Sequence, residues 1–279
     1  MSVIAIANQK GGVGKTTTAV NLAAGLALAG YTVCLIDCDP QGNATTYVND
    51  QLEIDYTLTD VVCTPSDMKK GFLPVMDAIY QTSMENLHVL PSKITLSRFE
   101  RESVIAVDRL AKTITTVGRE YDFTVCDTPP SLGPLFTGAL KAASHLIIPL
   151  TPAHLSLEGI STLLDTIEEI RQIRPEGMPL LEILGVLLTR YDPRTNISKE
   201  VFATISAHPQ LGPRLLNARI TVNTRLDEAP GDHVPIYLSP WKGESLDRAM
   251  EQFNELTHEI LKQLKVPAPG SRGKLKEVK

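Results

Sequence analysis

A glycine-rich loop near the N-terminus limits what this chain can fold into more than any other feature. Residues 10–17 read Lys-Gly-Gly-Val-Gly-Lys-Thr-Thr, and they lie between an apolar run at 2–7 and a helix-like stretch at 15–29. Glycines let consecutive N–H groups curl around phosphate oxygens, and the N-terminus of a helix adds partial positive charge. Chance would produce Gly-Gly-x-Gly-Lys-Thr in roughly one chain of this length in several hundred. The loop therefore predicts a phosphate site between a strand and a helix.

The loop departs from the standard phosphate-loop pattern at one position. That pattern, Gly-x-x-x-x-Gly-Lys-Ser/Thr, places its first glycine where this chain has Gln9. The chemistry survives, because Lys15 can still reach the β- and γ-phosphates of a nucleotide and the Thr16 hydroxyl can still hold Mg²⁺. We expect the nucleotide to be held by Gly11, Gly12, Val13, Gly14, Lys15, Thr16 and Thr17.

Apolar runs alternate with helix-like stretches along the whole chain. Strands are expected at 2–7, 31–37, 86–92, 121–127, 145–150, 182–189 and 214–220. Helices are expected at 15–29, 95–118, 133–143, 155–173, 197–207 and 244–264, and surface helices within 40–85. This alternation predicts an α/β fold with a single doubly wound, mainly parallel sheet flanked by helices. We expect one domain over 1–265 and a flexible basic tail over 266–279.

Composition narrows the class of protein. The chain has 27 Lys and Arg against 32 Asp and Glu, a net charge of −5, which excludes a strongly basic nucleic-acid-binding protein but permits a local basic patch. The four cysteines have no zinc-ligand spacing, and Cys34 and Cys126 lie in apolar runs, so we expect reduced core thiols. No leader peptide and no membrane-length apolar stretch is apparent, so a cytoplasmic chain is expected.

Five segments together resemble one family, the ParA/Soj partition ATPases within the ParA/MinD group. The loop resembles their deviant Walker A motif, and residues 37–44, Asp-Cys-Asp-Pro-Gln-Gly-Asn-Ala, resemble their DxDPQGNA segment. Residues 127–132 resemble their Walker B motif and the switch after it, and 192–196 and 223–230 resemble two C-terminal segments. The resemblance covers about residues 2–264 and implies a Mg²⁺-dependent ATP hydrolase on a P-loop fold.

The resemblance implies a role for each site residue. The family's equivalent of Lys10 reaches into the partner's nucleotide site, which implies a homodimer formed on ATP binding. Lys15 binds phosphate, Asp39 positions the attacking water, and Thr16, Asp37 and Asp127 belong to the Mg²⁺ site. Thr128 and Pro129 begin a segment that can sense the γ-phosphate. Adenine recognition is expected near 189–196 and 223–230, with Asn223 and Pro230 as the contacts.

The same resemblance implies non-specific binding of double-stranded DNA through Arg194 and Arg225. The chain departs from the family nearby, because Ile-Thr-Val-Asn-Thr-Arg replaces the frequent Ile-Pro-Arg-Asn-Val-Arg at 220–225 and one arginine is lost. Arg214 and Arg219 lie close in sequence, and Lys199 is expected to add to the patch. A ParB-like or other cargo-bound activator is the expected protein partner, and the nucleoid the expected location.

Two other classes of function remain open from sequence. A MinD-like positioning ATPase would need a C-terminal amphipathic helix, but the tail is rich in Pro and Gly, so no membrane partner is expected. A carrier or ligase on the same fold would need paired cysteine ligands or a second substrate pocket. The single tryptophan, Trp241, is expected to pack against the last helix.

Overall fold

The computed structural model describes residues 2–49, 52–65, 71–101, 104–152, 157–174, 179–266 and 269. Its strands form one eight-stranded sheet with the order β3-β4-β2-β5-β1-β6-β7-β8. The strands are β1 (Ser2–Ile6), β2 (Val33–Asp37), β3 (Tyr80–Gln81), β4 (Leu87–Leu90), β5 (Phe123–Asp127), β6 (His145–Leu150), β7 (Glu182–Tyr191) and β8 (Leu215–Thr221). All neighbouring pairs are parallel except β3 with β4. The predicted sheet is confirmed.

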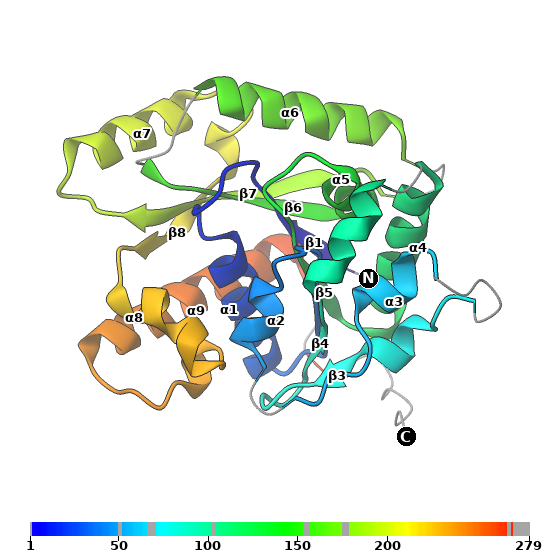
Figure 1. The fold of residues 1–279 in the computed structure, drawn as a ribbon. Coiled ribbons are helices and arrows are strands. Elements are labelled where there is room, and N and C mark those ends of the chain that lie inside the picture. The colour runs from blue at the N-terminus through cyan, green and yellow to red at the C-terminus, as the bar shows by residue number, and fades with distance from the viewer. Residues whose placement is uncertain are drawn as a thin grey trace.

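Helices cover both faces of the sheet (Figure 1). The α-helices are α1 (Lys15–Leu28), α2 (Asn43–Tyr47), α3 (Leu58–Val62), α4 (Val104–Glu120), α5 (Pro134–Ala142), α6 (Leu157–Gln172), α7 (Asn196–Ala207), α8 (Thr224–Glu228) and α9 (Glu244–Leu264). Short 3₁₀ helices are η2 (Val75–Ala78), η3 (Ile94–Arg101), η5 (Gly212–Arg214), η6 (Ala229–Asp232) and η7 (Ile236–Leu238).

Alternate strand residues feed two separate apolar cores. On one face, side chains such as Ile4 and Leu35 pack under α1 and α9. On the other, Val3 and Ile36 pack under α4, α5 and α6. Because both faces are covered, the strands are apolar at nearly every position, as parallel sheets require. All four cysteines are buried and none is in a disulfide among the described residues, as expected for core thiols.

The structure corrects two local predictions. The helix expected over 95–118 is divided, because residues 94–101 form a 3₁₀ helix whose buried Leu96 and Phe99 are spaced by its three-residue turn. Residues 40–85 contain short helices that are largely buried, and also the antiparallel edge strand β3, which was not predicted. Trp241 precedes α9 and is 51% exposed, and its packing against that helix stays a prediction.

Two further expectations concern the ends of the chain and membranes. The tail at 266–279 lies almost entirely outside the described residues, so its flexibility stays a prediction. In the part of the chain that the structure describes, no helix is both long and apolar enough to cross a membrane.

Candidate functional site

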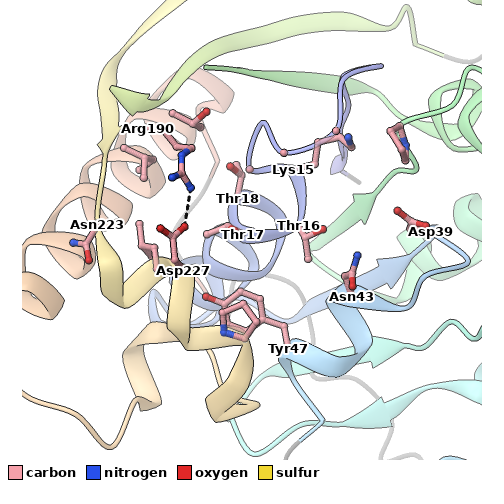
Figure 2. A pocket seen from close by; sticks show the side chains of 18 of the residues that line it. Lys15, Thr16, Thr17, Thr18, Asp39, Asn43, Tyr47, Arg190, Asn223 and Asp227 are labelled. Atoms are coloured by element: carbon pink, nitrogen blue, oxygen red, sulfur yellow. Dashed lines mark hydrogen bonds and ion pairs between the residues drawn. The ribbon is translucent and has the colours of Figure 1, made fainter. Parts of the chain in front are cut away.

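A cavity of about 520 Å³ opens at the carboxyl end of the parallel strands, within the usual size range for small-molecule sites. Figure 2 shows the glycine-rich loop and the start of α1 in its middle, Asp39 and Asn43 on one side, and Arg190, Asn223 and Asp227 on the other. The sequence-predicted residues that line it are Gly11, Gly12, Gly14, Lys15, Thr16, Thr17, Asp39, Asn223 and Pro230. One cavity thus brings together segments more than 200 residues apart.

The loop has the backbone that its glycines permit. Gly12 and Gly14 have φ of 73° and 78°, in the left-handed region where a side chain is strained. The Val13 side chain is buried, so only its backbone can face a phosphate. From β7, the Thr189 hydroxyl donates to the Val13 carbonyl at 2.9 Å, and its methyl group lies against Gly14. The sequence reading missed Thr189, which supports the loop from 176 residues away.

The two lysines of the loop are connected through the backbone. The Lys15 amine donates to the Lys10 carbonyl at 2.9 Å, and the Lys10 N–H donates to the Asn8 side chain at 3.0 Å. Asn8 itself donates to the Pro149 carbonyl at the end of β6. Burial lowers the pKa of the Lys15 amine, against the opposing effect of the Asp127 and Asp39 charges. The loop is therefore ordered by its own contacts and by neighbouring strands.

Three carboxylates lie at the ends of adjacent strands beside the loop. Asp37 and Asp127 face each other across β2 and β5, and Asp39 lies just beyond β2. The Asp37 oxygens accept from the Asp39 N–H and from the Thr45 N–H and hydroxyl, at 2.7–3.1 Å. Asp37 therefore fixes the start of α2 and the position of Asp39. Its expected place near Mg²⁺ stays a prediction.

The pKa values in this group follow from burial. Desolvation raises the pKa of the Asp127 carboxyl well above its usual range, and the Asp37 charge adds to the effect. Desolvation likewise raises the pKa of Asp37 to about 6, although hydrogen bonds from Thr45 oppose the shift. Buried carboxylates with raised pKa values are typical of sites where a cation completes the charge balance.

The residues around Asp127 fit a magnesium ion. The Thr16 hydroxyl donates to one Asp127 oxygen at 2.7 Å. The other oxygen is buried, and it has no hydrogen-bond partner among the described residues. Hydroxyl and carboxylate oxygens are the ligands that Mg²⁺ prefers. This pair is the best-supported part of the predicted metal site.

The far end of the cavity differs from the prediction in its polar groups. The Asn223 oxygen accepts from the Arg225 N–H and the Ser245 hydroxyl, and its amide donates to the Ser245 carbonyl. Asn223 therefore lines the cavity but uses its polar atoms to begin α8. Arg190 and Asp227 instead present charged groups here, joined by an ion pair at 2.8 Å (Figure 2).

Arg190 reaches the cavity because the sheet is irregular at this point. The pairing of β7 with β8 shifts between Thr189 and Tyr191, so Arg190 is an extra residue, and its φ is 50°. A bulge of this kind redirects a side chain. Arg190 and Asp227 both lie in segments that the resemblance marked for adenine recognition. The sequence did not single them out, because a bulge depends on strand register and has no clear sequence signal.

The predicted DNA-binding arginines lie outside the cavity, and both are paired. Arg194 is 87% exposed and contacts Asp192, whereas Arg225 is 32% exposed and contacts Glu228. Arg219, which is close to these arginines in sequence, places its guanidinium over the rings of Tyr191 and Phe202, 5.1 Å and 4.5 Å from their centres. Its guanidinium therefore takes part in packing beside α7.

This fold and cavity define a P-loop nucleotide-binding ATPase. The sequence model of the AAA domain family matches residues 1–178. The crystal structure of cobyrinic acid a,c-diamide synthase from Mycobacterium smegmatis with bound ADP and magnesium has a similar fold, with a TM-score of 0.76 and 27% identity, covering 96% of this chain and 98% of that one.

Curated relatives identify the family more narrowly. The sporulation initiation inhibitor protein Soj of Bacillus subtilis is 37% identical over 92% of this chain and 97% of its own length. The chromosome partitioning protein ParA of Caulobacter vibrioides is 39% identical over 85% of this chain and 87% of its own. The chain belongs to the Soj/ParA family of partition ATPases, as the motifs predicted.

Proposed function

We propose that this chain is a partition ATPase that binds Mg²⁺ and ATP, forms a homodimer around the nucleotide and holds double-stranded DNA without sequence preference. A ParB-like or other cargo-bound activator then stimulates hydrolysis and releases the dimer. The cargo is a chromosome origin, a plasmid or a protein body on the nucleoid. The observation that carries the proposal is the Thr16–Asp127 pair beside a phosphate loop that begins with Lys10, because the second, buried oxygen of Asp127 has no hydrogen-bond partner among the described residues.

Each residue of the loop has a role that its geometry supports. The backbone N–H groups and the Lys15 amine bind the phosphates, while Thr16 and Asp127 hold the metal. Bound Mg²⁺ neutralises charge on the phosphate oxygens. Asp39 is 8% exposed and lines the cavity, where its carboxylate can orient a water toward the terminal phosphate. Asp37 keeps Asp39 in place through the Asp39 N–H.

Lys10 supports the homodimer part of the proposal. Its backbone is fixed on both sides by Asn8 and Lys15, so its position in the loop is defined before a partner arrives. A cation brought to the terminal phosphate from a second protomer would stabilise charge that develops in the transition state. Lys10→Ala should therefore abolish ATP-dependent dimerisation or hydrolysis. Unchanged sedimentation and unchanged turnover in that variant would contradict this role.

The DNA part is tested by retention on duplex DNA with ATP, with ADP and without nucleotide, at low and moderate salt. Retention only with ATP, indifferent to sequence and lost as salt rises, is the expected result. Failure to bind in every state would contradict it. Co-sedimentation with liposomes in the presence of ATP would instead indicate a MinD-like membrane function, which the curated relatives disfavour.

A further inference from the structure

Three arginines at or beside the surface expected to hold DNA are each in a direct ion pair with a carboxylate. Arg194 pairs with Asp192, Arg225 with Glu228 and Arg190 with Asp227, each at 2.6–2.8 Å. Two of these pairs lie outside the cavity, so they are available to a ligand that approaches from solvent. In both of these outer pairs, the acid lies two or three residues from its arginine, on the same helix or turn.

The Asp192–Arg194 pair is the more complete of the two. The Arg194 Nε donates to one Asp192 oxygen at 2.9 Å and an Nη donates to the other at 2.8 Å, while the Arg194 N–H also donates to Asp192. This fork-to-fork arrangement is the geometry with which a guanidinium binds a phosphate. These hydrogen bonds lower the pKa of Asp192 to about 2, so Asp192 is charged at any physiological pH.

Arg225 is held by two groups of different kinds. An Nη donates to Glu228 at 2.6 Å within α8, and the guanidinium lies over the Trp241 ring, 4.8 Å from its centre. The Trp241 indole N–H donates in turn to Asp232. Arg225 is therefore oriented by the protein and already neutralised by an acid of the same helix.

We propose that Asp192 and Glu228 are intramolecular competitors of the DNA backbone, which set a threshold that a single protomer does not pass. Each arginine must exchange its carboxylate for a phosphate, and the released acid then lies close to the phosphate charge. The net gain per arginine is small, so retention needs the combined arginines of two protomers. This inference rests on the proposed function, because it assumes that DNA binds this surface.

Two isosteric substitutions test the proposal. Asp192→Asn keeps an oxygen for the turn at Arg194, and Glu228→Gln keeps the length of its side chain. Each substitution removes the negative charge and replaces one acceptor oxygen with an NH2 group, so the ion pair is lost at nearly constant shape. Glu168→Gln is the matched control, because Glu168 pairs with Arg171 in the same i, i+3 arrangement on α6 and changes the net charge equally. The two test positions lie on different elements, so either one carries the test if the other variant has a lower melting temperature.

The measurement is fluorescence anisotropy of a labelled DNA duplex, titrated with each full-length variant in ATP, in ADP and without nucleotide, from 50 to 200 mM salt. With ATP, we expect each test variant to bind about two- to fivefold more tightly than wild type, the range that exposed ion pairs span. The gain should shrink as salt rises, and the Glu168→Gln control should stay near wild type. In the double variant, DNA binding at 50 mM salt should also appear without ATP.

Two results separate the inference from the function on which it rests. If wild type binds DNA with ATP but the test variants gain no more than Glu168→Gln, the competitor role is wrong and the proposed function stands. If wild type and all variants fail to bind DNA in every nucleotide state, the proposed DNA-binding function itself is wrong.

Discussion

The phosphate end of the cavity and the arginine surface both place cationic side chains beside carboxylates, but the two regions differ in burial. At the phosphate end, Asp37 and Asp127 are fully buried, and all of their oxygens but one accept a hydrogen bond from the described residues. At the arginine surface, Arg194 is 87% exposed, so an anion from solvent can compete with Asp192 for its guanidinium. Burial makes the first region selective for one ligand geometry, whereas exposure leaves the second tolerant of any phosphate chain and sensitive to salt.

The largest effect should come from removing the carboxylate that faces the cavity. Asp39→Ala should lower ATP turnover by about 10²- to 10³-fold, the cost of losing one positioned catalytic group, while ATP binding persists. Phosphate release and equilibrium nucleotide binding measure the two quantities separately. Full turnover would remove Asp39 from the mechanism, and parallel loss of nucleotide binding would make its role structural.

The next largest effect should come from substitutions that change the arginine surface and leave the buried phosphate end intact. The double variant Arg194→Ala with Arg225→Ala should lose DNA binding by about 10²-fold at low salt, because hydrogen bonds to charged groups are lost on both protomers. Dimerisation with ATP, followed by sedimentation, should be unchanged. DNA retention at wild-type strength would refute the assignment of this surface.

A smaller effect tests the support behind the loop. Thr189→Val keeps the methyl contact with Gly14 but removes the hydroxyl that donates to the buried Val13 and Leu150 carbonyls. Nucleotide affinity should fall by about tenfold, as expected for the loss of a buried hydrogen-bond donor. Thr204→Val, which removes an exposed hydroxyl hydrogen bond on α7, is the control and should bind nucleotide normally. Equal affinities in the two variants would contradict the supporting role of Thr189.

The smallest predicted effect is a pH dependence confined to the buried region. The pKa of Asp37 is raised to about 6 and that of Asp127 is raised well above its usual range, so acidic pH favours the protonated forms of this pair. Because Mg²⁺ binds the ionised form, metal affinity should rise with pH from 5 to 7 by at most about tenfold over the whole range, with proton release. Calorimetry of Mg²⁺ binding to the nucleotide complex in two buffers of different ionisation enthalpy measures the protons. Proton uptake, or a flat profile, would contradict the assignment.

Sequence reasoning recovered what local pattern determines. The loop, the strand-end carboxylates and the order of strands and helices could be predicted because each is written in contiguous residues. Thr189 and Asn8 could not, since their contacts join strands far apart in the chain. Arg190 reaches the cavity only through a shift in strand register. The 3₁₀ helix at 94–101 was read as α-helix because its apolar spacing of three residues also fits an α-helical stripe.

The acids beside the arginines can be seen in the sequence, but the sequence does not predict that they form ion pairs with these arginines. Asp192 and Glu228 stand two and three residues from the arginines that they neutralise. Only side-chain geometry shows that each pair is closed. A count of arginines in a motif therefore overstates the positive charge of the surface, because neighbouring carboxylates neutralise part of it.

Trp241 has a practical consequence. It is the only tryptophan among 279 residues, half of its surface meets solvent, and the Arg225 guanidinium rests over its ring. The chain therefore contains its own fluorescent probe, in contact with one of the two arginines that we propose exchange a carboxylate for a phosphate. When Arg225 turns from Glu228 to a phosphate, its guanidinium leaves the Trp241 ring. The fluorescence emission of Trp241 should then change. Capture and release of DNA could then be followed in real time on the unlabelled protein.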